Sequence, residues 1–72
     1  MINIVESPMQ GIINSVHVKV GDDVKEGDLL CLLEAMKMLT PLESSVKGKI
    51  AAVHVAEKQP VARGEKLIEI EY

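Results

Sequence analysis

The sequence predicts an all-β domain, and three patterns lead to that prediction. Apolar and polar residues alternate in short runs, as in residues 16–20 and 66–71, and a period of two indicates a strand with one face in water. Glycine, proline and Gly-Asp pairs interrupt the chain every several residues, which is the spacing of short strands in a sandwich or barrel. The third pattern is an internal repeat.

The two halves of the chain match each other without a gap when the sequence is shifted by 37 positions. Residues 1–35 align with residues 38–72, and 12 of the 35 aligned pairs are identical, among them Gly11 with Gly48 and a shared Val-His-Val. Chance alone gives roughly two identities in such a comparison. We therefore expect two copies of one β unit to pack about a pseudo-two-fold axis in a single domain, since neither half is long enough to bury a core.

The strands can be phased in chain order with the help of the repeat. Residues 16–20 and 53–55 are expected to be strands with one wet face, and residues 29–35 are the counterpart of residues 66–71. The two glutamates of the last segment should face water, so that Ile68 and Ile70 point inward. Shifting this phase back by 37 places Cys31 and Leu33 in the core and Glu34 outside. Cys31 is interpreted as a buried apolar residue rather than a reactive thiol.

Composition and charge exclude several classes of function. The 72 residues are 47% hydrophobic and 26% charged, with a formal net charge of −3 and Tyr72 as the only aromatic residue. Scattered lysines and arginines and the lack of a stacking surface argue against nucleic-acid binding. The longest apolar run, residues 29–33, is far shorter than a membrane helix of about 20 residues, so no membrane insertion is expected. One cysteine excludes an internal disulfide, and His17 and His54 have no third ligand spaced to form a metal site.

Lys37 lies at the junction of the two halves and is a candidate functional residue. If residues 29–35 and 38–42 are antiparallel strands, Met36 and Lys37 form a two-residue hairpin turn with the amine in solvent. Such turns favour Asn-Gly because they place one or both central residues at positive φ, and Met-Lys fits that rule poorly. Local rules tend to fail at functional sites. Spacing alone leaves open an ordinary surface lysine between two methionines that pack on the strand ends.

The residues around the turn resemble a known attachment motif. Glu34-Ala35-Met36-Lys37-Met38 is similar to the motif of biotinyl domains, the biotin carboxyl carrier family, in which the lysine between two methionines takes biotin in amide linkage. Ser7-Pro8-Met9-Gln10-Gly11 resembles the opening turn of that family, and residues 18–28 resemble its Val-Lys-x-Gly-Asp-x-Val-x-x-Gly stretch. The resemblance covers essentially the whole chain.

The resemblance implies both a fold and a role. The fold is a flattened barrel of two four-stranded antiparallel sheets with pseudo-two-fold symmetry and the lysine at a hairpin turn. A biotin protein ligase would attach biotin to Lys37, and the carboxybiotin arm would carry CO2 from a biotin carboxylase to a carboxyltransferase. The domain itself would be non-catalytic. Glu34, Ala35, Met36 and Met38 complete the implied cofactor-binding motif, the methionines either touching partners or packing on the strands.

Alternatives and departures from the family pattern accompany this reading. A lipoyl carrier domain of a 2-oxo-acid dehydrogenase shares the expected fold, although its lysine usually follows aspartate, and an unmodified adaptor module would use the same barrel. Lys58-Gln59-Pro60 stands where the first half has Gly21-Asp22-Asp23, a change that we expect to lie remote from Lys37. Pro41 is expected at a strand edge or bulge.

Two further expectations concern the parent enzyme and its location. The halves align without the protruding loop of some bacterial acetyl-CoA carboxylase carriers, which weakly favours an acyl-CoA or pyruvate system. The N-terminal residues lack the features of a secretory signal. The expected compartment is therefore the cytoplasm, or the mitochondrial matrix if the domain comes from a eukaryotic carboxylase.

Overall fold

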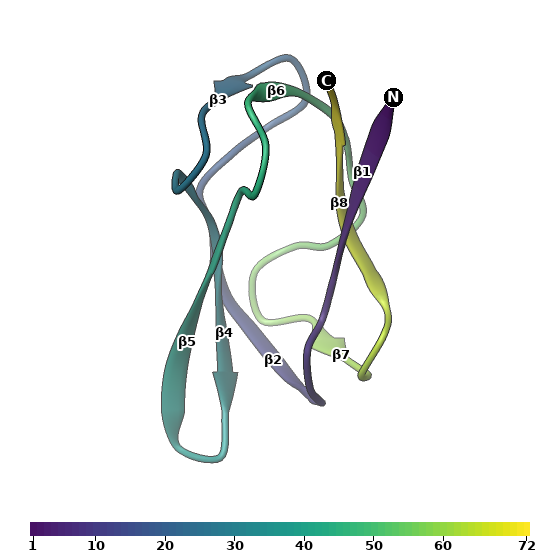
Figure 1. Cartoon of the computed structure of the whole chain (residues 1–72). Helices are drawn as coiled ribbons and strands as arrows, with labels where there is room; N and C mark the ends of the chain where they lie inside the picture. Colours follow the sequence, from purple (N-terminus) through teal and green to yellow (C-terminus); the bar gives the residue numbers. More distant parts are fainter.

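Eight β-strands make up the protein, and the computed structural model describes all 72 residues. The strands are β1 (Ile2–Glu6), β2 (Gly11–Val16), β3 (Asp23–Val24), β4 (Leu29–Ala35), β5 (Met38–Glu43), β6 (Gly48–Val53), β7 (Pro60–Val61) and β8 (Lys66–Glu71). They form two four-stranded antiparallel sheets with the orders β1-β8-β6-β3 and β5-β4-β2-β7 (Figure 1). The predicted fold class is confirmed. The fold has no helix that could cross a membrane.

The two sheets are related by the same shift of 37 residues that relates the two halves of the sequence. Moving β1 to β4 along the chain by 37 positions gives β5 to β8, and this exchange turns the strand order of one sheet into that of the other. The irregularities follow the same rule, because the register shift between Ile13 and Ser15 in β2 recurs between Ile50 and Ala52 in β6. Each half therefore contributes strands to both sheets.

The core lies between the sheets and is built from twelve buried aliphatic or small residues. Ile68, Ile70, Cys31 and Leu33 are fully buried and Glu34 is exposed, so the predicted phase is confirmed. A register shift in the pairing of β4 with β5 allows Leu30 to be buried beside Cys31 although the two are consecutive. Burial raises the pKa of the Cys31 thiol, which keeps it protonated and unreactive at neutral pH.

The predicted strand over residues 16–20 is wrong beyond its first residue. β2 ends at Val16, and the chain turns where Lys19 N donates to Asp22 Oδ2 at 3.0 Å and Gly21 takes a φ of 95°. Val20 is consequently 62% exposed. The valines do alternate with polar residues, but the turn interrupts the strand before the alternation is complete. In this turn the Asp22 carboxylate accepts a hydrogen bond and Gly21 has a positive φ. The same boundary occurs in the second half, where β6 ends at Val53.

The two histidines lie just beyond these strand ends rather than within strands. Both side chains are exposed, as predicted. His17 Nε2 lies 2.8 Å from Ser15 Oγ, whereas His54 Nε2 lies 2.6 Å from Glu69 Oε2. Their backbone amides occupy equivalent places, because each donates to the leucine carbonyl at the start of β4 or β8.

The hairpin joining β4 to β5 and the two chain termini lie at opposite ends of the molecule (Figure 1). At the hairpin, Ala35 pairs with Met38 next to the two linking residues. At the other end, Met1 N donates to Tyr72 O and Tyr72 N donates to Met1 O, both at 2.9 Å. Tyr72 and Met1 are the repeat equivalents of Ala35 and Met38, so the terminus end is a hairpin without its turn.

Candidate functional site

Lys37 stands at the apex of the β4–β5 hairpin. Met36 and Lys37 have φ values of 51° and 65°, both in the left-handed region, which is the conformation of a two-residue type I′ turn. The predicted tight turn is confirmed. Residues other than glycine in this region cost of order 1–3 kcal/mol each, a strain that persists only when the surrounding structure enforces it. Here the six paired positions of β4 and β5 hold the turn closed.

The ammonium group of Lys37 has no partner within the chain. Its side chain is exposed, the one ion pair of the protein joins His54 to Glu69, and no side-chain hydrogen bond involves Lys37. The nitrogen is therefore accessible from solvent.

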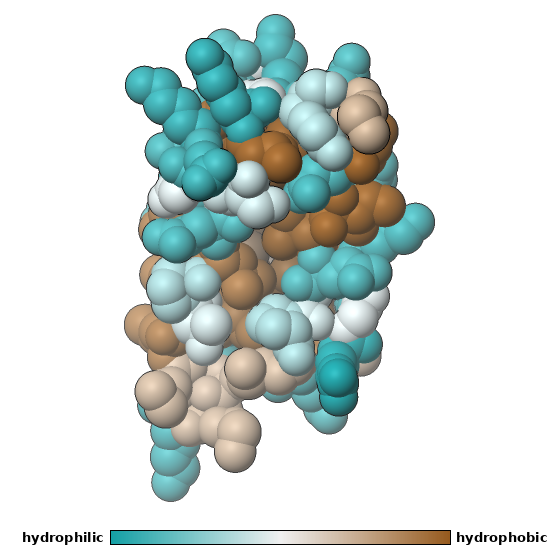
Figure 2. All heavy atoms as spheres, in the orientation of Figure 1, coloured by the Kyte–Doolittle hydropathy of each residue, from teal (hydrophilic) through white to brown (hydrophobic).

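The two methionines that flank Lys37 also stand in solvent. Met36 is 89% exposed and Met38 is 69% exposed. Weakly hydrophobic side chains gather at this end of the molecule (Figure 2). The interpretation in which the methionines pack on the strand ends is thus wrong: Met36 lies in the turn itself, and Met38 begins the edge strand β5 with its side chain in solvent. They offer soft, adaptable contact surface to another protein.

Glu34 and Ala35 play different parts from the three residues at the tip. Ala35 is buried and Glu34 is exposed, with its Oε1 3.5 Å from Asn14 Nδ2. Gly11 of β2 lies beneath them, where a Cβ atom would come within 2.6 Å of Glu34 O and 3.1 Å of Ala35 Cβ. The small residues at positions 11 and 35 therefore allow β2 and β4 to approach closely under the hairpin.

A groove runs beside the hairpin, and the sequence interpretation missed it. We call it the hairpin groove; its ten lining residues are Met9, Gln10, Gly11, Ile12, Glu34, Ala35, Met36, Lys37, Pro60 and Val61. Pro60 of β7 pairs with Ile12 of β2 and so lies near Lys37. The expectation that Lys58-Gln59-Pro60 is remote from Lys37 is therefore wrong for Pro60. A comparison of the two halves could have indicated the groove, because an uncharged Pro60 stands where the first half has the charged Asp23.

Pro41 lies where the sequence predicts it. It belongs to β5, which is an edge strand of its sheet and pairs with β4 alone. Proline lacks the N–H that a further strand would need, so it protects this edge from pairing with another chain.

Comparison with known proteins identifies the family. The model of the biotin/lipoyl attachment family, described as "Biotin-requiring enzyme", matches residues 3–70. The chain belongs to this family. The match spans both halves of the repeat and the whole hairpin, so the attachment-domain family accounts for every strand described above.

Curated relatives place this attachment domain among the biotin carboxyl carrier domains of carboxylases. It is 41% identical over 69 residues to the mitochondrial propionyl-CoA carboxylase alpha chain of Sus scrofa, covering 96% of this chain and 10% of that one. It is 43% identical over 68 residues to the biotin carboxyl carrier protein of Streptococcus mutans, covering 94% of this chain and 52% of that protein. The chain thus spans about half or less of the length of these relatives.

A solved structure shows how widely the fold is shared. The lipoyl domain of the 2-oxoglutarate dehydrogenase complex of Azotobacter vinelandii superimposes with a TM-score of 0.84 at 24% identity, covering 96% of this chain and 95% of that one. This likeness concerns the fold alone. The strands alone therefore do not distinguish a biotin carrier from a lipoyl carrier.

Proposed function

We propose that Lys37 Nζ carries biotin in amide linkage and that the domain serves as the mobile carrier of a biotin-dependent carboxylase. One observation carries the proposal: an exposed, unpartnered lysine stands between two exposed methionines at a strained turn. The relatives of the attachment domain include proteins named as biotin carboxyl carriers, which supports biotin over lipoic acid. The similarity to the propionyl-CoA carboxylase alpha chain supports an acyl-CoA acceptor.

The residues present fit an attached biotin. Amide formation requires a neutral amine, so Lys37 Nζ would give up a proton to the ligase, attack the activated carboxyl carbon of biotin and displace the activating group. No carboxylate of the chain pairs with Lys37 and stabilises its charged form. The exposed Met36 and Met38 give a biotin protein ligase an apolar surface on both sides of the nitrogen.

The chain's own contribution is mechanical rather than catalytic. Biotin supplies the carboxyl-carrying chemistry when bound. The paired strands β4 and β5 hold Lys37 at a fixed end of the molecule, and tethering there raises the effective concentration of the carried group at nearby active sites. We propose that these sites belong to a biotin carboxylase and a carboxyltransferase, which the hairpin end visits in turn.

The test is intact-mass measurement after co-expression with a biotin protein ligase. We expect the mass of one biotinyl group on the parent chain and none on Lys37→Arg, with unchanged folding because the side chain packs against nothing. Lys58→Arg is the matched control, since Lys58 is also an exposed lysine at positive φ, and it should retain the adduct. A lipoyl mass, or a biotin adduct that persists in Lys37→Arg, would contradict the proposal.

A further inference from the structure

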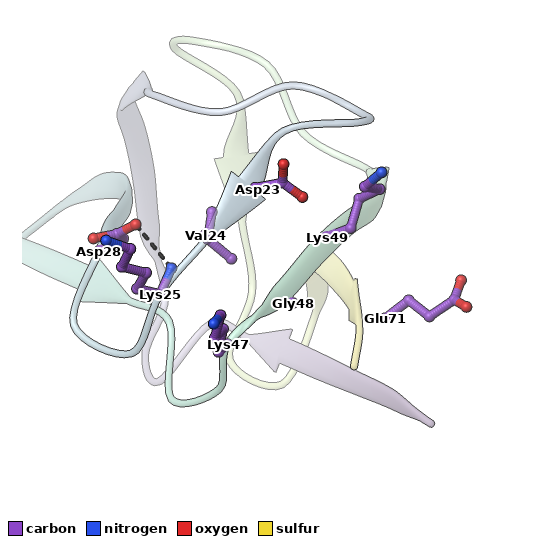
Figure 3. A pocket seen from close by; sticks show the side chains of 8 residues that line it. All are labelled: Asp23, Val24, Lys25, Asp28, Lys47, Gly48, Lys49 and Glu71. Atoms are coloured by element: carbon purple, nitrogen blue, oxygen red, sulfur yellow. Dashed lines mark hydrogen bonds between the residues drawn. The ribbon is translucent and has the colours of Figure 1, made fainter.

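The hairpin groove has a counterpart at the other end of the molecule. We call it the terminal groove; its eight lining residues are Asp23, Val24, Lys25, Asp28, Lys47, Gly48, Lys49 and Glu71 (Figure 3). Six of them are the repeat equivalents of residues that line the hairpin groove. The same backbone hollow, between an edge two-residue strand and the neighbouring long strand, therefore occurs twice in one chain.

The two grooves differ sharply in charge. Six of the eight residues lining the terminal groove are charged, as the sticks in Figure 3 show. In the hairpin groove only Glu34 and the tether Lys37 are charged among ten residues. Lys47 corresponds to Gln10, Lys49 to Ile12, and Asp23 to Pro60.

The fold does not require the neutral lining. The terminal groove shows that the same backbone accepts lysine at the position of Ile12 and aspartate at the position of Pro60. Ile12 is 48% exposed, so its side chain gains only part of the free energy of a buried isoleucine. Ile12 shares the groove with Met9, Met36, Pro60 and Val61, and a contiguous apolar surface of this kind, unlike a single exposed residue, indicates a contact.

We propose that the hairpin groove is the resting site of the biotin ring attached to Lys37 of the same chain. This inference rests on the proposed biotinylation. Lys37 itself lines the groove, so a group attached to its nitrogen starts beside it. The biotin ring system is uncharged, with an apolar thioether side and a ureido group that has two N–H donors and one carbonyl acceptor.

The lining complements that chemistry. Ile12 and Pro60 provide apolar surface for the thioether side of the ring, and the exposed Glu34 carboxylate is an acceptor for ureido N–H groups. Gln10 provides an amide with both a donor and an acceptor. The terminal groove also has carboxylate acceptors, Glu71 among them, but its lysines replace the apolar surface that the ring would contact.

Tethering makes even a weak site effective. A short flexible linker gives an effective concentration in the mM range, so a ring that binds with a dissociation constant of about 1 mM would occupy the groove for about half of the time. Such a resting site shields the ring from solvent between visits, yet a partner's active site that binds the ring more tightly easily withdraws it.

The experiment is proton NMR on the chain carrying biotin, with the adduct verified by intact mass. We expect nuclear Overhauser contacts between ring protons and the Ile12 methyl groups, and chemical shift changes between unmodified and biotinylated chain in the hairpin groove but not in the terminal groove. An adduct without such contacts overturns the resting site and leaves the proposed function standing. Absence of the adduct overturns both.

The repeat supplies a matched pair of variants. Ile12→Lys gives the hairpin groove the residue of its counterpart, and Lys49→Ile makes the reverse change in the terminal groove. Both positions are solvent-facing in equivalent strands. We expect Ile12→Lys to abolish the ring contacts and sharpen the ring resonances to those of a free tether, and Lys49→Ile to change neither. Ring resonances that are equally sharp in parent and Ile12→Lys would overturn the proposal.

Discussion

The hairpin end and the terminus end of this molecule are two versions of one structure. Both present a pair of strands, β4 with β5 or β8 with β1, that ends in a residue pair joined by backbone bonds. The hairpin end adds two linking residues, Met36 and Lys37, and a groove without most of the charges found at the other end. The two equivalent ends therefore differ by a few residues on a shared arrangement of strands.

Backbone strain also differs between the hairpin turn and an ordinary turn elsewhere in the chain. Three residues other than glycine have positive φ: Met36, Lys37 and Lys58. Lys58 stands where the first half has Gly21, whose φ is 95°. The strain at Lys58 arises because lysine replaces a glycine at an ordinary turn, whereas the strain at Met36 and Lys37 belongs to the turn that exposes the Lys37 nitrogen.

The largest effect is expected from building the missing turn at the terminus end. A circular permutant with Met-Lys inserted between Tyr72 and Met1, Tyr72→Ala, and new termini between Arg63 and Gly64 would carry Glu-Ala-Met-Lys-Met at both ends. We expect two biotin adducts by intact mass after co-expression with the ligase, because the new turn would join strands of equivalent geometry.

Two controls make this permutant decisive. The same permutant with Met-Arg inserted should carry one adduct, as should the permutant combined with Lys37→Arg. A single adduct in the permutant itself would contradict the prediction and show that the ligase requires more of the hairpin end than the motif and its turn.

A smaller effect is expected from relieving the strained turns. Lys58→Gly and Lys37→Gly each remove a side chain from the left-handed region, and each should stabilise the protein by about 0.5–1 kcal/mol after the extra entropy of glycine in the unfolded chain is subtracted. Urea unfolding measures the change. Lys37→Gly should lose the biotin adduct and Lys58→Gly should keep it; destabilisation by Lys58→Gly would show that the turn is not strained there.

The smallest effect is expected from the ion pair that distinguishes the two histidines. With His54 protonated, Glu69→Gln should cost less than about 0.5 kcal/mol of the free energy of unfolding at low salt, and still less in 1 M salt, because both partners are partly exposed. Ser15→Ala, which removes the neighbour of His17, is the corresponding change in the other half. A loss above about 1 kcal/mol for Glu69→Gln would contradict the assignment of a solvated pair.

The features that could be predicted from the sequence are those that follow from periodicity and the repeat. The phase of residues 66–71 correctly placed Cys31 and Leu33 in the core, because side chains in a strand alternate strictly between faces. The exposed turn at Met36 and Lys37 followed from the two-residue spacing between strands. These inferences need only the local chain and one symmetry operation.

The features that were missed depend on contacts between distant segments. The strand predicted over residues 16–20 ends after Val16 because the turn around Asp22 and Gly21 is fixed by hydrogen bonds that the alternation does not reveal, including Gly21 N to Ile50 O at 2.9 Å. The hairpin groove depends on β7 crossing to pair with β2. Its neutral lining becomes visible in the sequence only when the two halves are compared charge by charge.

The closeness of Met1 and Tyr72 determines the end of the domain from which a connecting polypeptide would leave. Any polypeptide joined to either residue departs from the pole opposite the lysine, along a body whose longest extent is 32 Å. A connecting polypeptide and the Lys37 turn therefore lie at opposite ends of the long axis, so that the connection leaves the solvent around the turn unobstructed.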